Sequence, residues 1–287
     1  MKKAFKNIAI FGKFSISLPI ALSCFIAFVL FNEQLSWEGV LAATGIFFMS
    51  AGASALNQFQ EQNRDKLMRR TQDRPLPRGI FSKKKALLTI SCFCITGTTI
   101  LSTFNLSAVI WGWAGIIWYN LIYTPLKTKT AFSVFPGAVV GAIPPIAGWC
   151  AAGGSIVDFR IHFIAFFFFL GQMPHFWLLV LKYKNQYKNA GFPVITDHLS
   201  NSQVVRINLI WFIATFISAL FLPILDIITK EATSWIAFLA SIIMIIWVVK
   251  STMETIQARS PQLLRKQFIY FNSFYLLIML LVIADKI

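Results

Sequence analysis

Side chains with oxygen ligands recur at every fourth position in the most polar stretch of the sequence. Asn57, Glu61 and Asp65 stand at i, i+4 and i+8, so on a helix they line one face at intervals of about 6 Å. Mg²⁺ prefers carboxylate and amide oxygens and keeps positions open for water or phosphate. This oxygen ladder, as we call the three residues, therefore suits one or two Mg²⁺ ions that also hold a diphosphate.

Arginines follow the oxygen ladder directly, at Arg69, Arg70, Arg74 and Arg78. Guanidinium groups bind phosphate oxygens in bidentate fashion, so acids that hold metal, followed by arginines, are typical of a diphosphate site at a membrane surface. The same residues also fit a solvated juxtamembrane loop whose arginines contact anionic lipids. Spacing alone leaves both interpretations open.

The elements that must position these residues are membrane-spanning helices. Of the 287 residues, 57% are hydrophobic and 13% are charged, so the apolar surface exceeds what one soluble core could hide. Nine segments are each about long enough to cross a hydrocarbon core of roughly 30 Å. They are residues 13–32, 37–57, 86–104, 106–124, 132–152, 160–181, 205–226, 233–250 and 268–285. We predict an all-α polytopic membrane bundle of nine transmembrane helices around a central cavity, forming a single domain over residues 1–287.

The basic residues are divided unequally between the two sides of this bundle. The chain has 26 Lys and Arg and a formal charge of +15, a balance that also occurs in nucleic-acid-binding proteins. With the N-terminus inside, all of them fall on the inside except Arg160, Lys230 and Lys286. This positive-inside asymmetry accounts for the charge without nucleic acid, and it predicts a cytoplasmic N-terminus and an external C-terminus.

Prolines occur within two of the predicted helices. Pro144 and Pro145 in the fifth and Pro174 in the sixth remove backbone donors and predict kinks, and such breaks usually line a cavity. His175 follows Pro174 directly. An ionisable residue at this depth is a functional candidate, although a structural hydrogen bond explains it equally well.

The oxygen ladder resembles the first signature, N-x-x-x-D-x-x-x-D, of the intramembrane prenyltransferases of the UbiA superfamily. Its continuation, Met68-x-Arg70-Thr71-x-x-Arg74-Pro75-Leu76, is similar to the protohaem IX farnesyltransferase (haem O synthase) branch. The stretches 123–130 with 141–149, and 172–177 with 182–193, also agree with that branch. The matches run in order from about residue 50 to residue 195, and the family likewise has nine helices.

The resemblance implies a Mg²⁺-dependent enzyme of the bacterial plasma (inner) membrane. Its expected reaction is transfer of a farnesyl group from farnesyl diphosphate to the 2-vinyl group of haem B, giving haem O. The resemblance implies that Asn57, Glu61 and Asp65 hold the metal, and that His175 contacts haem iron or acts as a base. The residues expected at the substrates are Arg70, Arg74, Tyr123, Lys127, Lys182, Lys184 and Tyr187. Membrane lipid is a further expected partner, as are haem A synthase or the assembly proteins of a terminal oxidase.

The sequence departs from the family pattern at two places. Glu61 stands where the family usually has Asp. The family also commonly has an acid just before Tyr187, where a second metal is bound, whereas here Asp197 is the only carboxylate between residues 182 and 206. Two alternatives follow: a prenyltransferase of the same superfamily that acts on an aromatic quinone precursor, and a non-catalytic haem-binding assembly factor with a degenerate site. Turnover separates these classes.

Overall fold

Long apolar helices make up most of the chain. The computed structural model describes residues 2–258 and 261–287. Within those residues, nine helical segments are long and apolar enough to cross a membrane and no strand occurs, which confirms the predicted all-α bundle. The long helices are α2 (Phe14–Asn32), α3 (Trp37–Gln60), α5 (Lys83–Ser102), α6 (Leu106–Ile117), α8 (Val134–Ala151), α9 (Phe159–Asn189), α10 (Asn201–Ile224), α11 (Glu231–Ala258) and α12 (Pro261–Asp285).

Short helical pieces connect the long ones or precede them. The π-helix η1 continues α6 and leads into α7, so these three pieces form one membrane span. The short pieces are α1 (Lys2–Phe11), α4 (Gln62–Asp65), η1 (Trp118–Tyr123), α7 (Thr124–Leu126), η2 (Ala131–Ser133) and η3 (Ile195–Asp197).

Polar cap residues mark where several spans begin. Ser36 accepts a hydrogen bond from the backbone N–H of Gly39, and Asn105 accepts one from Ala108. Ser200 and Gln203 form a capping box at the start of α10. Because such side chains satisfy backbone donors that the helix leaves open, they fix the first residue of each helix.

The helices pack with small residues at their closest contacts. A Cβ on Gly148 of α8 would overlap the carbonyl of Cys24 on α2, and a Cβ on Gly97 of α5 would lie 2.8 Å from the carbonyl oxygen of Gly45 on α3. Lipid supplies no hydrophobic driving force between helices, so close backbone approach of this kind stabilises the bundle. Large apolar side chains such as Leu106 face outward instead.

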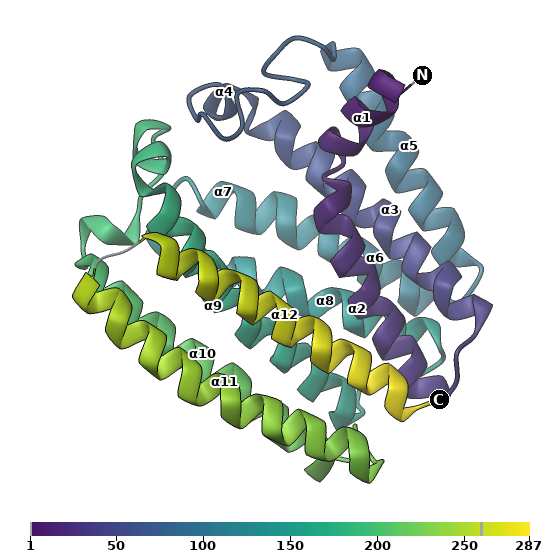
Figure 1. Cartoon of the computed structure of the whole chain (residues 1–287). Coiled ribbons are helices and arrows are strands. Elements are labelled where there is room, and N and C mark those ends of the chain that lie inside the picture. Colours follow the sequence, from purple (N-terminus) through teal and green to yellow (C-terminus); the bar gives the residue numbers. More distant parts are fainter. Residues whose placement is uncertain (1, 259–260) are drawn as a thin grey trace.

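The two ends of the bundle carry different parts of the chain (Figure 1). The N-terminus lies at the same end as α4 and the loop that follows it, and the C-terminus lies at the opposite end, beside the end of α2. Helix α9 extends eight residues beyond its predicted end and continues through Pro174. Its one non-helical residue is Tyr183, with φ −118° and ψ 15°, so the irregular backbone lies further along the helix than the proline.

Candidate active site

The oxygen ladder lies where α3 ends. Asn57 occupies the last turn of α3, Glu61 separates α3 from α4, and Asp65 closes α4. Hydrogen bonds from the Glu61 N–H to the Asn57 carbonyl and from the Asp65 N–H to the Glu61 carbonyl, both 2.9 Å, keep the helical spacing across the break. All three residues are buried, with exposures of 2%, 3% and 0%. Consecutive turns therefore present three oxygen-bearing side chains in a protected position.

Each residue of the ladder has its own cation. Lys127 donates to both carboxylate oxygens of Glu61, at 3.0 and 3.1 Å, and Arg74 donates to Oδ2 of Asp65 at 2.7 Å. Lys13 donates to Oδ1 of Asn57 at 2.9 Å. Three cations thus face two carboxylates, and the excess positive charge suits an anionic ligand.

Lys13 is a member of this cluster that the sequence did not predict. It stands between α1 and α2 with a left-handed backbone, φ 47°, and its ammonium also lies 3.4 Å from the Tyr119 hydroxyl. Non-glycine residues in this conformation are uncommon and cluster at functional sites. No local sequence pattern identifies Lys13, because its partner Asn57 is 44 residues away.

The π-helix η1 supplies a second set of contacts that the sequence did not predict. Thr124, directly after η1, accepts a hydrogen bond from the Asn57 amide at 3.2 Å. Asn120, within η1, donates to Gln60 Oε1 at 3.1 Å and to the Ala53 carbonyl at 3.0 Å. These contacts join the fourth span to the end of α3, and π-helical turns are frequent at functional sites.

Burial and charge act in opposite directions on the carboxyl of Glu61. Burial raises its pKa, but the Lys127 ammonium, together with the positive charges of Lys13 and Arg74, holds the pKa below its ordinary value. Burial lowers the pKa of Lys13, and the positive charge of Arg74 lowers it further. Glu61 is therefore ionised at neutral pH, while Lys13 holds its proton less firmly than an exposed lysine does.

Arg70 joins the loop after α4 to the end of α9. Its guanidinium donates to the Tyr187 hydroxyl at 3.0 Å, and its backbone N–H donates to Gln186 Oε1 at 3.1 Å. The guanidinium also lies 5.2 Å from the ring centroid of Tyr183 and 5.5 Å from that of Tyr187. Gln186 stands just before Tyr187, where the family commonly has an acid. Hence Gln186 contacts the loop after α4 directly.

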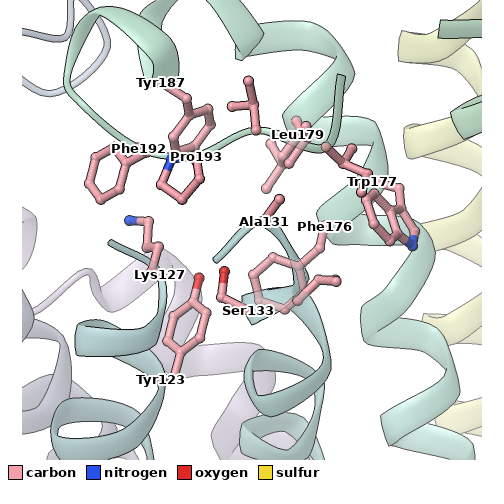
Figure 2. A pocket seen from close by; sticks show the side chains of 14 residues that line it. Tyr123, Lys127, Ala131, Ser133, Phe176, Trp177, Leu179, Tyr187, Phe192 and Pro193 are labelled. Carbon is pink, nitrogen blue, oxygen red and sulfur yellow. The ribbon is translucent and has the colours of Figure 1, made fainter. Parts of the chain in front are cut away.

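A small pocket with aromatic walls adjoins the cluster (Figure 2). Figure 2 shows Lys127, Tyr123 and Phe176 on one side of it and Tyr187 and Phe192 on the other. The Lys127 ammonium lies 4.5 Å from the ring centroid of Phe192. The pocket holds about 50 Å³ in this conformation, so a prenyl chain requires the helix ends to separate.

Three other predicted residues lie apart from the ladder. Lys184 donates to Asn201 Oδ1 at 3.2 Å, and the Lys182 ammonium lies 5.0 Å from the ring centroid of Tyr183. His175 packs against Phe268 of α12, with ring centroids 4.8 Å apart. The structure therefore brings Asn57, Glu61, Asp65, Arg74 and Lys127 together, links Arg70 to Tyr187 nearby, and places Tyr123 in the pocket wall.

The donor set of the ladder fits a hard divalent cation. Oδ1 of Asp65 is fully buried and accepts no hydrogen bond from the described residues, which is costly for a carboxylate oxygen unless a ligand completes it. The described residues contain no cluster of three His, Cys, Asp or Glu. Two carboxylates and one amide oxygen instead leave positions for water and phosphate, as Mg²⁺ sites usually do.

Curated proteins of known activity resemble the chain over most of its length. A protoheme IX farnesyltransferase from Geobacter sulfurreducens is 40% identical over 201 residues, which cover 69% of this chain and 73% of that protein. A protoheme IX farnesyltransferase from Cytophaga hutchinsonii is 34% identical over 239 residues, covering 80% and 82%.

Solved structures share the fold at low sequence identity. The apo structure of a UbiA homolog from Aeropyrum pernix aligns with a TM-score of 0.77 at 13% identity, covering 95% of this chain and 98% of that one. A UbiA homolog from Archaeoglobus fulgidus bound to DMAPP and Mg²⁺ aligns with a TM-score of 0.70 at 16% identity, covering 97% and 99%. The UbiA prenyltransferase family itself matches residues 16–277, nearly the whole chain. The chain is an integral membrane protein that belongs to the UbiA prenyltransferase family.

Proposed function

We propose that this protein transfers a farnesyl group from farnesyl diphosphate to the 2-vinyl group of haem B and gives haem O. Family membership supports prenyl transfer, and the curated relatives named protoheme IX farnesyltransferase support haem as the acceptor. The observation that carries the proposal is the buried ladder with a cation on each of its three residues.

Binding of the diphosphate is the first task of the cluster. Lys13, Arg74 and Lys127 already lie within hydrogen-bond distance of the ladder, and they gain a second acceptor when diphosphate enters. Preorganised cations stabilise the negative charge that grows on the departing diphosphate. Asn57, Glu61 and Asp65 would hold Mg²⁺, which supplies further charge neutralisation at the leaving oxygens.

The transfer itself requires a dry environment. The bond between C1 of the farnesyl group and its diphosphate oxygen breaks, and C1 bonds to the terminal vinyl carbon. Aromatic walls such as Phe176 and Phe192 keep water from the allylic cation. Water then adds to the adjacent carbon, which the porphyrin stabilises as a cation, and the added water loses a proton.

His175 is the residue we assign to the haem, either at its iron or as the base that takes this proton. It lies on α9 between the aromatic rings of Phe176 and Phe268. If His175 binds the iron, the His175→Ala variant should show a shifted absorption spectrum of bound haem in the absence of farnesyl diphosphate. If His175 is the base, the variant should keep that spectrum and lose only turnover.

Orientation and partners complete the proposal. We infer from the distribution of the basic residues that the ladder and the N-terminus lie on the cytoplasmic side of the bacterial plasma membrane. Haem A synthase, or assembly proteins of a terminal oxidase, would receive the product. Copurification from membranes that contain these proteins tests this last step.

The test is identification of the product. Purified protein in lipid receives haem B, labelled farnesyl diphosphate and Mg²⁺, and the porphyrin is analysed by mass spectrometry. We expect labelled haem O. A parallel reaction contains an aromatic quinone precursor in place of haem B. Prenylation of that precursor alone would indicate the related aromatic enzyme, and haem binding without turnover would indicate an assembly factor.

A further inference from the structure

A second pocket lies at the end of the bundle opposite the oxygen ladder. Four parts of the chain meet there: the end of α2, the start of α9, the turn between α10 and α11, and the end of α12. Its volume is about 370 Å³. The charged residues that line this distal pocket are Glu33, Arg160, Asp226, Lys230, Asp285 and Lys286.

Asp285 holds the turn before α11 by hydrogen bonds. Its carboxylate accepts hydrogen bonds from the backbone N–H of Thr229 at 2.8 Å and of Lys230 at 2.7 Å, and from the hydroxyl groups of Thr229 and Thr233. It thereby caps the start of α11. Because these donors use its oxygens, Asp285 gives only partial compensation to any cation beside it.

Lys286 is that cation. Its side chain is 6% exposed, and its ammonium lies 3.3 Å from Oδ2 of Asp285 and 4.0 Å from Oε1 of Glu33. Both distances are longer than a typical charge-assisted hydrogen bond, and the ammonium has three donors. A nearly buried ammonium in this state favours an additional anion in the pocket.

The other charges divide into two groups. Arg160 is paired with Asp158 at 2.8 Å and lies over the Trp149 ring, and Lys230 donates to the Ala284 carbonyl at 3.3 Å. Glu33 and Asp226 are both exposed and stand at the ends of α2 and α10, with φ of 54° and 56°. The pocket thus combines three cationic side chains with three carboxylates, and two of these carboxylates, those of Glu33 and Asp226, are exposed.

Exposed apolar side chains stand close in sequence to the charged residues of the distal pocket. Phe31, Phe159 and Ile224 are 36%, 56% and 70% exposed, and each precedes a charged residue of the pocket by one or two positions. Exposed apolar side chains at a helix end contact lipid acyl chains. A ligand with a charged head and an apolar body fits this surface better than a free anion does.

We propose that the distal pocket binds the headgroup of a phospholipid that carries a phosphate and a primary ammonium, such as a phosphoethanolamine lipid. The phosphate binds Lys286 with Lys230 and Arg160. The ammonium donates to Glu33 and Asp226. A choline headgroup has no N–H to donate, and a glycerol headgroup has no positive charge, so both match the two carboxylates less well.

Native mass spectrometry of the full chain in detergent tests this assignment. Equal concentrations of dioleoyl lipids with ethanolamine, choline or glycerol headgroups compete for binding. We expect the ethanolamine lipid to be retained at least about fivefold more than either of the others, since one charge-assisted hydrogen bond contributes about 1 kcal/mol or more. Equal retention of all three would overturn the proposal.

Variants separate the headgroup contacts from the fold. Lys286→Met should lower the retention of all three lipids, because each carries the phosphate, whereas Lys83→Ala, an exposed lysine at the start of α5, should leave their retention unchanged. The double variant Glu33→Gly and Asp226→Gly suits the left-handed backbone at both positions, so it should keep the thermal stability while losing the preference for ethanolamine over glycerol.

Two outcomes in these experiments contradict the proposal. One is unchanged lipid retention in Lys286→Met, or an unchanged ethanolamine preference in the double glycine variant. The other is an equal rise in unfolding temperature with inorganic phosphate and with the ethanolamine lipid, which would indicate a site for a soluble anion.

Discussion

The ammonium of Lys127 donates hydrogen bonds to both carboxylate oxygens of Glu61, at 3.0 and 3.1 Å. The two residues lie 66 positions apart, on segments that follow the fourth and the second membrane span. Lys127, which we propose binds the diphosphate, is therefore held by Glu61, which we propose binds the metal. Each residue restrains the other before substrate enters.

This pairing predicts that substitutions of the two residues are not additive. Glu61→Gln and Lys127→Met should each lower turnover at least about tenfold, and the double variant should lose less than the product of both effects. Turnover per folded molecule is the measurement. Glu61→Asp, which keeps the charge, serves as the control and should retain most activity. Fully multiplicative losses would show that the contact has no part in the reaction.

The bridge between Arg70 and Tyr187 predicts closure over the bound diphosphate. Tyr187→Phe removes only the hydroxyl acceptor of the 3.0 Å hydrogen bond, so it should raise the KM for farnesyl diphosphate about threefold to tenfold. Arg70→Ala also removes the contacts with both rings and should raise it further. Limited proteolysis of the loop after α4 should increase in the same order. Equal KM values in all three proteins would exclude this role.

The neutral side chain of Gln186 predicts that an acid at this position changes the Mg²⁺ concentration that the enzyme requires. A neutral oxygen binds a hard divalent ion much less strongly than a carboxylate does, so Gln186→Asp should lower the Mg²⁺ concentration at half-maximal rate. Lys184→Ala is a suitable control, because the Lys184 ammonium bonds Asn201 rather than the ladder. The Mg²⁺ titration should not move in that variant. An unchanged titration for Gln186→Asp would confine metal binding to the ladder.

The orientation of the chain gives a fourth prediction. An odd number of spans places the two termini on opposite sides, and the basic residues assign the inside to the N-terminus. Reporter fusions after Ile287 should therefore be active outside the cytoplasm, and fusions in the loop after α4 should be active within it. A cytoplasmic signal at both places would contradict the nine-span topology.

The spans were predictable because hydropathy and length are local properties. The predicted segments agree with the helices except at their ends, and the largest differences are in α9 and α11, which each continue eight residues beyond the predicted end through polar residues. Hydropathy detects where a helix leaves lipid, not where it stops. The same limit explains why α1 was not predicted, since it has only ten residues and Lys2, Lys3 and Lys6 interrupt its apolar positions.

The ladder was predictable and its surroundings were not. Asn57, Glu61 and Asp65 have a regular spacing, so their shared face follows from helix geometry. Lys13, Asn120 and Thr124 reach the ladder from other spans, and only tertiary packing brings them there. The irregular backbone at Tyr183 was likewise not predicted, since it lies further along α9 than Pro174, through which the helix continues.

The central claim is that this cluster ionises farnesyl diphosphate and that water completes the transfer to haem. The most direct measurement is the mass of the porphyrin formed from haem B, farnesyl diphosphate and Mg²⁺ in H₂¹⁸O. We predict haem O with one farnesyl group and one ¹⁸O atom from the unaltered protein. The control variant Asp73→Asn, which replaces an exposed acid in the loop after α4, should give the same product. Asp65→Asn should form it at least about a hundredfold more slowly while still inserting into the membrane. Normal turnover by Asp65→Asn, or no farnesylated porphyrin from the unaltered protein, would contradict the account.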